Sequence, residues 1–333
     1  MASMRLFHAR PGTSSGARRA DSDYGAHGDP DWRSIDWGPH LHDAVIADRR
    51  VRYCDYGAGD GPPVVMIHGL GGSWQDWLEN IPRIGQDRRV IAVDLPGHGG
   101  SEMPAEKISI SRFGRCVDSL CEQLGLGEVV LVGNSMGGFT AAEVAIQFPS
   151  RAAGVVLVSA AGITINSLNG SPILAGARLI AMAFTSAAAQ AAHTVTRRRL
   201  RPLMYGSFIR YPSRMPVDLL YEITHSGGGP GWMDSLDAIT SYDFRDRLTE
   251  ISCPTLVVWG AEDMLVPLSD ADDFERLIPN ARKVVFEDTG HVAMMERPRT
   301  FNDCVAQFIG ETSSSLGVEA EAAGAPPAAA AAA

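Results

Sequence analysis

The stretch Gly133-Asn134-Ser135-Met136-Gly137-Gly138 joins an apolar run to a segment with helical spacing, and it directs the interpretation of the whole chain. It contains the pattern G-x-S-x-G, which places a serine on a sharp turn between a strand and a helix. Glycines at positions 133 and 137 leave room for that turn. The bare pattern is common by chance, but here the strand–turn–helix context accompanies it. We therefore predict that Ser135 is a nucleophile rather than a solvated serine in a glycine-rich connection.

Short apolar runs recur on both sides of this turn. They are apolar on both faces, as strands of a covered parallel sheet are. These runs are Val64–Ile67, Val90–Val93, Val129–Val132, Val155–Val158, Leu256–Trp259 and Lys283–Phe286. Helical patterns lie between or after most of them, at Trp74–Ile84, Ile110–Leu124, Met136–Phe148, Leu268–Ile278 and Arg297–Ile309. The alternation predicts an α/β fold, with an antiparallel hairpin over His42–Ala47 and Arg49–Tyr56 at the sheet edge.

One long interval, between Val158 and Leu256, breaks the alternation. It is too long for a plain loop inside a compact domain, and its apolar patterns predict a helical insertion that covers one end of the sheet. We assign residues 41–160 and 246–311 to the core and residues 161–245 to this cap. Residues 1–40, rich in Gly, Ser, Asp, Arg and Pro, are expected to be mostly disordered, as are residues 312–333, which end in Pro and Ala.

The composition limits the classes of partner. The 333 residues include 29 basic and 39 acidic side chains, and the formal net charge of -10 gives no support to nucleic-acid binding. The five cysteines are scattered and match no disulfide framework or metal motif. We therefore expect reduced thiols, a cytoplasmic location and no metal or organic cofactor. No apolar stretch has the character of a signal peptide or of a stable membrane span.

A serine hydroxyl is a weak nucleophile and needs a neighbouring base, for which the chain offers nine histidines. His291 follows the last expected strand, so it should lie at the same carboxyl edge of the sheet as the serine. His68 and His98 are its rivals, but each sits in a tight glycine setting that favours a loop-shaping role. His193 and His225 lie in the insertion, where they could touch substrate. We assign His291 as the base.

The base needs an acid that orients its ring and stabilises the imidazolium. Asp263 follows the penultimate expected strand, and the chain order serine, aspartate, histidine is typical of a serine on such a turn. Glu262 is the adjacent alternative. For the oxyanion of a tetrahedral intermediate, we assign the backbone N–H groups of Met136, which follows the nucleophile, and of Leu70, in the glycine-rich loop after an earlier strand. These assignments predict a Ser-His-Asp triad with an oxyanion hole.

Over about residues 41–310 the chain resembles the α/β-hydrolase superfamily. The motifs that carry the resemblance are His68-Gly69, Asp94-Leu95-Pro96-Gly97-His98-Gly99-Gly100-Ser101, the turn at Ser135, Asp263 and Gly290-His291. The resemblance implies a mostly parallel eight-stranded sheet flanked by helices, with a cap domain at the long insertion. It also implies that the segment beginning at Asp94 is structural.

Within this superfamily, the turn at Ser135 is similar to that of the meta-cleavage-product hydrolases, which cut carbon–carbon bonds. Two features depart from those enzymes. Their oxyanion loop is usually richer in glycine and proline than Leu70-Gly71-Gly72-Ser73, and their catalytic histidine is usually followed by Trp, where this chain has Val292. Haloalkane dehalogenases and epoxide hydrolases use aspartate in place of the serine. Perhydrolase-type members keep the serine triad and stay open as an alternative.

We therefore expect a carboxylic ester hydrolase that forms an acyl-enzyme on Ser135 and takes a small or lipid-like apolar substrate. The first alternative is a carbon–carbon bond hydrolase of the meta-cleavage-product type, and the second is a non-catalytic ligand-binding member of the fold. Apolar residues of the insertion offer pocket surface, at Ile173, Leu174, Leu179, Ile180, Met182 and Phe184. The basic run Arg197–Arg201 is expected to form a solvated helix face.

Overall fold

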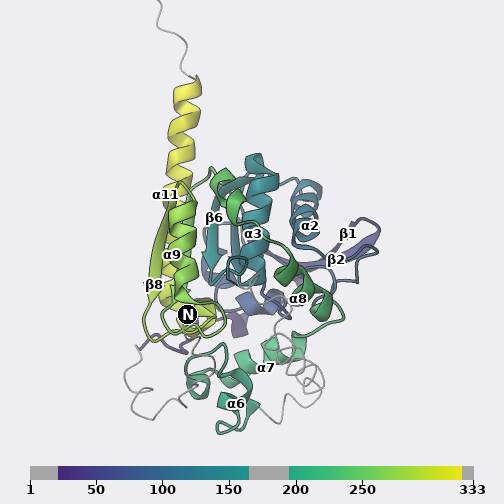
Figure 1. The fold of residues 1–333 in the computed structure, drawn as a ribbon, viewed down its shortest axis with the longest axis vertical. Coiled ribbons are helices and arrows are strands. Elements are labelled where there is room, and N and C mark those ends of the chain that lie inside the picture. The colour runs from purple at the N-terminus through teal and green to yellow at the C-terminus, as the bar shows by residue number, and fades with distance from the viewer. Residues whose placement is uncertain (1–21, 165–194, 325–333) are drawn as a thin grey trace, which may run out of the picture.

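The structure is a computed structural model that describes residues 22–164 and 195–324, so His193 and the expected pocket residues from Ile173 to Phe184 lie outside the described residues. Eight strands form its centre: β1 (Leu41–Ile46), β2 (Arg49–Tyr56), β3 (Val64–Ile67), β4 (Val90–Val93), β5 (Val129–Asn134), β6 (Ala152–Val158), β7 (Thr255–Gly260) and β8 (Ala281–Phe286). They make one sheet in the order β1-β2-β4-β3-β5-β6-β7-β8. Figure 1 shows β1 and β2 at one side of the sheet and β8 at the other.

The sheet is mixed. β1 and β2 pair as an antiparallel hairpin, and β2 is also antiparallel to β4. The hairpin turns at Ala47 and Asp48, whose φ angles of 49° and 60° match the twist of a tight two-residue turn. The other neighbours pair in parallel, from β4 through to β8. The predicted edge hairpin and mostly parallel eight-stranded sheet are therefore confirmed.

Helices cover both faces of this sheet. One face packs against α2 (Ile110–Gln123), α3 (Met136–Gln147) and α9 (Leu268–Leu277). The other face packs against the 3-10 helix η3 (Trp74–Trp77) and the helices α1 (Ile81–Ile84), α10 (Ala293–Glu296) and α11 (Pro298–Gly324). Every residue of β3 to β7 is buried, which explains their apolar sequences on both faces. Each buried Val or Ile contributes about 1.5–3 kcal/mol relative to exposure.

The insertion between β6 and β7 contributes α6 (Arg201–Tyr205), α7 (Val217–Ser226) and α8 (Trp232–Ser241). In Figure 1, α6 and α7 lie at the lower end of the molecule and α8 lies above them. Short 3-10 helices complete the fold: η1 (Trp32–Ser34), η2 (Gly38–His40), η4 (Pro149–Arg151), η7 (Pro212–Arg214) and η8 (Arg245–Glu250). Among the helices of residues 22–164 and 195–324, none combines the length and the apolar character of a membrane span.

Three local expectations differ from the structure. Residues 22–40 are not loose, because Tyr24 and Trp32 bury their rings against the core and anchor this segment. At the other end, α11 continues past residue 312 to Gly324, through Ala-, Glu- and Leu-containing sequence that favours a helix. Arg201 is buried, since its guanidinium donates to the carbonyls of Val195 and Met215 at 2.7 and 2.9 Å instead of facing solvent.

Candidate active site

Ser135 occupies the turn between β5 and α3. Its φ and ψ angles are 54° and -115°, a backbone conformation that residues other than glycine rarely adopt. Two backbone hydrogen bonds hold it there: its N–H donates to the carbonyl of Val158 at 2.9 Å, and its carbonyl accepts from the N–H of Ala161 at 3.1 Å. The end of β6 thus keeps a costly conformation in place, as is typical of functional turns.

Two glycines make the turn possible. A Cβ on Gly137 would lie 2.1 Å from the carbonyl oxygen of Ile67, and a Cβ on Gly133 would lie 2.1 Å from the carbonyl oxygen of Gly137. The first turn of α3 therefore lies directly against the ends of β3 and β5. Any side chain at either position would force the serine away from the sheet edge.

His291 follows β8 and is joined to Asp263, which follows β7. The Nδ1 atom of His291 lies 2.8 Å from Oδ2 of Asp263, and the two side chains are 5% and 0% exposed. The other oxygen of Asp263 accepts from the N–H groups of Leu265 and Val266 at 2.8 and 3.0 Å. A carboxyl oxygen beside Nδ1 favours the tautomer that carries its proton on Nδ1, which leaves Nε2 as the acceptor nitrogen.

Asn134 ties the histidine loop to the serine turn. Its buried amide donates to the carbonyls of His291 and Val158, both at 3.1 Å. The residue immediately before Ser135 therefore holds the backbone of His291. No role for Asn134 is predicted from the sequence, because the contact joins residues that are distant in the chain and match no local pattern.

Glu262, the alternative acid, is used differently. Its Oε2 accepts from the N–H of Thr289 at 2.8 Å, and its own N–H donates to the carbonyl of Thr289 at 3.0 Å. Burial raises the pKa of Glu262 above its ordinary value. The carboxylate that meets His291 is that of Asp263, while Glu262 supports the same loop through its backbone.

The rival histidines have other partners. His68 donates from Nδ1 to the carbonyl of Gly69 at 2.7 Å and accepts at Nε2 from the N–H of Leu95 at 3.0 Å. Burial lowers the pKa of His68 to about 3 and that of His98 to about 4. Their rings lie 5.2 Å apart beneath the loops. His225 stacks on Tyr221 within α7, at a ring separation of 5.6 Å.

The loop after β3 approaches the serine closely. A Cβ on Gly69, the residue before Leu70, would lie 3.4 Å from the Cβ of Ser135. The loop then bends at Gly71, whose φ is 73°.

Met136 is the first residue of α3, where backbone N–H groups have no partner within the helix. β3 and β5 are adjacent where the strand order reverses, which is where open α/β sheets bind ligands. The oxyanion roles of Leu70 and Met136 stay predictions.

Asp94 supports this loop from below. Its two carboxylate oxygens accept from the N–H groups of Trp74 and Gly100 at 2.7 and 2.8 Å. Burial, together with the nearby Asp94 charge, raises the pKa of Asp76 to about 8. Both of these carboxylate hydrogen bonds are with loop backbone, which agrees with the structural role that the resemblance implied.

The insertion contacts three loops at this edge. The N–H of Gly228 donates to the carbonyl of Gly71 at 2.7 Å, and the N–H of Gly231 donates to the carbonyl of Gly97 at 2.9 Å. The carbonyl of Phe208 accepts from the N–H of His291 at 2.8 Å. The loops after β3, β4 and β8 are therefore each bonded to the insertion.

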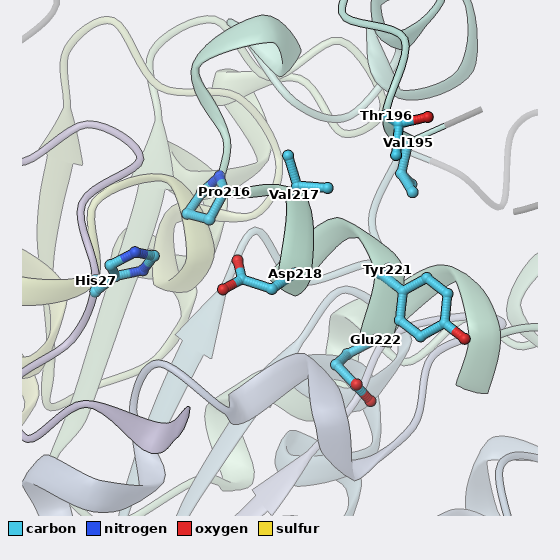
Figure 2. A pocket seen from close by; sticks show the side chains of 8 residues that line it. All are labelled: His27, Val195, Thr196, Pro216, Val217, Asp218, Tyr221 and Glu222. Carbon is cyan, nitrogen blue, oxygen red and sulfur yellow. The ribbon is translucent and has the colours of Figure 1, made fainter. Parts of the chain in front are cut away.

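A separate hollow of about 550 Å³ opens between the insertion and the N-terminal segment, as Figure 2 shows. It is lined by His27, Val195, Thr196, Pro216, Val217, Asp218, Tyr221 and Glu222. None of the predicted site residues contributes to it. In the part of the chain that the structure describes, no group of three His, Cys, Asp or Glu side chains is arranged to hold a metal ion.

Comparisons with known proteins identify relatives of the whole core. The family model described as "alpha/beta hydrolase fold" matches residues 62–298. The chain is 30% identical over 281 residues to the dihydrolipoyllysine-residue acetyltransferase component of an acetoin cleaving system from Pseudomonas putida, covering 82% of this chain and 70% of that protein. It is also 30% identical over 281 residues to a 2-hydroxy-6-oxo-6-phenylhexa-2,4-dienoate hydrolase from Comamonas testosteroni, covering 79% and 92%. The crystal structure of the enol-lactonase from Burkholderia xenovorans LB400 aligns with a TM-score of 0.66 at 25% identity, over 81% of this chain and 100% of that one.

Proposed function

Because the chain belongs to the α/β-hydrolase family, we propose that it is a serine hydrolase that cleaves carboxylic esters of small or lipid-like apolar substrates. The observation that carries the proposal is the 2.8 Å contact between His291 and Asp263, in a loop that Asn134 ties to the Ser135 turn. This geometry supports a nucleophile, a base and an acid assembled from three strand ends. The likeness to an enol-lactonase adds support, since a lactone is a cyclic ester.

In the proposed reaction, the Ser135 oxygen attacks the ester carbonyl while Nε2 of His291 takes the hydroxyl proton. Asp263 stabilises the imidazolium, and the N–H groups of Leu70 and Met136 bind the oxyanion. The tetrahedral intermediate collapses to an acyl-serine, and the alcohol leaves with the proton from His291. Water then gives its proton to His291 and attacks the acyl-serine, which releases the acid and restores the serine. The cycle needs no metal or organic cofactor.

We propose that the insertion, residues 161–245, is a cap that shapes the substrate site above a core of residues 41–160 and 246–311. Its backbone bonds to Gly71, Gly97 and His291 support this role, because they place it over the loops that carry the predicted machinery. The scattered cysteines support a cytoplasmic location.

Labelling with a fluorophosphonate tests the nucleophile. We expect the wild type to be labelled and Ser135→Ala to remain unlabelled. Ser159→Ala is a matched control, because Ser159 also follows a strand with a positive φ of 44° and is buried. Equal labelling of the wild type and Ser135→Ala would refute the serine-hydrolase proposal.

Carbon–carbon bond hydrolysis is the second candidate function, favoured by the 30% identity to a 2-hydroxy-6-oxo-6-phenylhexa-2,4-dienoate hydrolase. A substrate panel separates the two: short and long acyl esters, a lactone, a monoacylglycerol and a vinylogous diketo acid. We expect turnover of esters or the lactone. Exclusive turnover of the diketo acid would replace ester cleavage by the second candidate.

A further inference from the structure

Glu296 is a buried carboxylate that the proposed mechanism does not use. It ends α10, and its side chain is enclosed beneath the loop of His291. Its Oε1 accepts from the N–H groups of Gly290 and Val292 at 2.9 and 3.4 Å. These two residues flank His291 on either side. One carboxylate oxygen therefore holds the peptide groups before and after the predicted base.

The other oxygen of Glu296 joins two further segments. Oε2 accepts from the N–H of Arg210, in the insertion, at 2.8 Å, and from the hydroxyl of Tyr24, in the N-terminal segment. The Tyr24 hydroxyl itself accepts from the N–H of Tyr211 at 2.7 Å, so its single proton is directed at Glu296. Within the described part of the chain, every hydrogen-bond partner of this carboxylate is a donor, so both of its oxygens act as acceptors.

The N-terminal segment is anchored at this point by its backbone as well. The N–H of Gly25 donates to the carbonyl of Glu296 at 2.8 Å. The carboxylate of Asp23 accepts from the N–H of Thr300 at 2.9 Å, at the start of α11. The residues before and after Tyr24 are therefore both hydrogen-bonded to the core, and they hold Tyr24 against Glu296.

We propose that Glu296 is a positioning residue for His291 and that Tyr24 completes its action by holding the carboxylate in place. The inference rests on the proposed role of His291 as base. Among residues 22–164 and 195–324, the side chain that bonds the ring of His291 is that of Asp263, and the direction of the ring depends also on its backbone. Because Glu296 holds the neighbouring peptides, a change in its hydrogen bonds would tilt the ring away from the serine. Misplacement of a catalytic group by about 1 Å can cost roughly 100-fold in rate.

The environment of Glu296 is consistent with this role. Burial raises the pKa of Glu296 to about 7, against the hydrogen bonds that lower it. Burying a carboxyl group costs folding free energy. Buried ionisable groups with shifted pKa values occur frequently at functional sites.

The chain provides a matched control pair. The hydroxyl of Tyr242 donates to the buried Glu143 at 2.9 Å, and Arg247 lies 3.3 Å from the same carboxylate. This pair contacts α3 and the end of the insertion and makes no bond to residues 290–292. Removing this tyrosine–carboxylate contact tests whether a loss of protein stability alone lowers kcat.

The experiment compares Glu296→Gln and Tyr24→Phe with Glu143→Gln and Tyr242→Phe, in the full chain. Gln keeps the shape of Glu but replaces one acceptor by a donor, which must then face an N–H group. We expect kcat for an activated ester to fall roughly 10- to 100-fold in Glu296→Gln and about 3- to 10-fold in Tyr24→Phe, with KM within about two-fold of the wild type. The control variants should keep kcat within about two-fold even where their thermal stability falls equally. Wild-type kcat in both folded test variants would overturn the proposal, and Tyr24→Phe alone decides it if Glu296→Gln does not fold.

A second measurement separates this inference from the proposed function. The proton on Nδ1 of His291 gives a low-field NMR signal that is assigned by its loss in His291→Ala. We expect the signal to move or broaden in Glu296→Gln and Tyr24→Phe and to stay unchanged in the two controls. An unchanged signal in both test variants refutes positioning whatever the reaction is. A changed signal in a protein whose Ser135 resists labelling refutes the proposed function and leaves positioning intact.

Discussion

His68 and His291 both follow parallel strands at the same edge of the sheet, and both are buried, yet their partners differ. His68 uses both ring nitrogens on backbone groups, the carbonyl of Gly69 and the N–H of Leu95. His291 meets the carboxylate of Asp263 at Nδ1. Burial without a carboxylate lowers the pKa of His68 to about 3 and keeps it neutral. A neighbouring carboxylate stabilises the protonated form of a buried histidine, and this is what distinguishes the surroundings of His291 from those of His68.

The same substitution at both positions gives the largest contrast. We expect His291→Gln to lower kcat on an activated ester by about 10⁴-fold or more, because the proton acceptor is lost. His68→Gln should keep kcat within about ten-fold and lower the free energy of unfolding by about 1–3 kcal/mol, because two buried hydrogen bonds are disturbed. Steady-state kinetics and urea unfolding measure the two effects. Equal losses of kcat in the two variants would remove the distinction between the two histidines.

The acid next to His291 is tested by two neighbouring substitutions. Asp263→Asn should lower kcat by about 10³- to 10⁴-fold, because the amide favours the wrong ring tautomer and no longer stabilises the imidazolium. Glu262→Gln should lower kcat by less than about ten-fold, since Glu262 bonds the backbone of Thr289. Kinetics with the same activated ester compare them. A larger loss in Glu262→Gln would transfer the role of the acid to Glu262.

The smallest expected effect is on the pH dependence of stability. The pKa of His68 is about 3 in the folded protein and near 6.5 in an unfolded chain. As the pH falls below 6.5, His68 binds a proton in the unfolded chain but stays neutral in the folded protein. The free energy of unfolding therefore falls by up to about 1.4 kcal/mol per pH unit. Urea unfolding between pH 7 and 5 should show a shallower fall in His68→Gln than in the wild type. Identical slopes would mean that His68 is protonated in the folded state.

The sequence was sufficient for those parts of the fold that depend on local pattern. The apolar runs around Val64 and Val129 predicted buried strands because a residue covered on both faces must be apolar whatever its neighbours are. The serine turn could be predicted since its glycines are required by contacts within a few residues and with one adjacent strand. Asp263 and His291 could be proposed because each follows a strand, and parallel strands bring their carboxyl ends to one edge.

Asn134, Glu296 and Tyr24 could not be placed in the same way. Their partners lie far away in the chain, so no short pattern records them. Glu296 did leave one sign, since a carboxylate stands beside an apolar run that begins just after His291. The order of residues 22–40 was missed because composition suggested a loose segment, whereas the buried rings of Tyr24 and Trp32 and the backbone of Gly25 anchor it.

The joints between the insertion and the sheet edge are made from main-chain atoms at Gly71, Gly97 and Phe208. Main-chain bonds do not depend on the identity of a side chain, so much of the insertion can change its sequence without losing these attachments. If residues 161–245 form the proposed cap, the side chains that face a substrate can therefore change while the loops beneath them keep their positions. Under the proposed function, the insertion that would select the compound is thus attached to, but distinct from, the loops that would carry out the reaction.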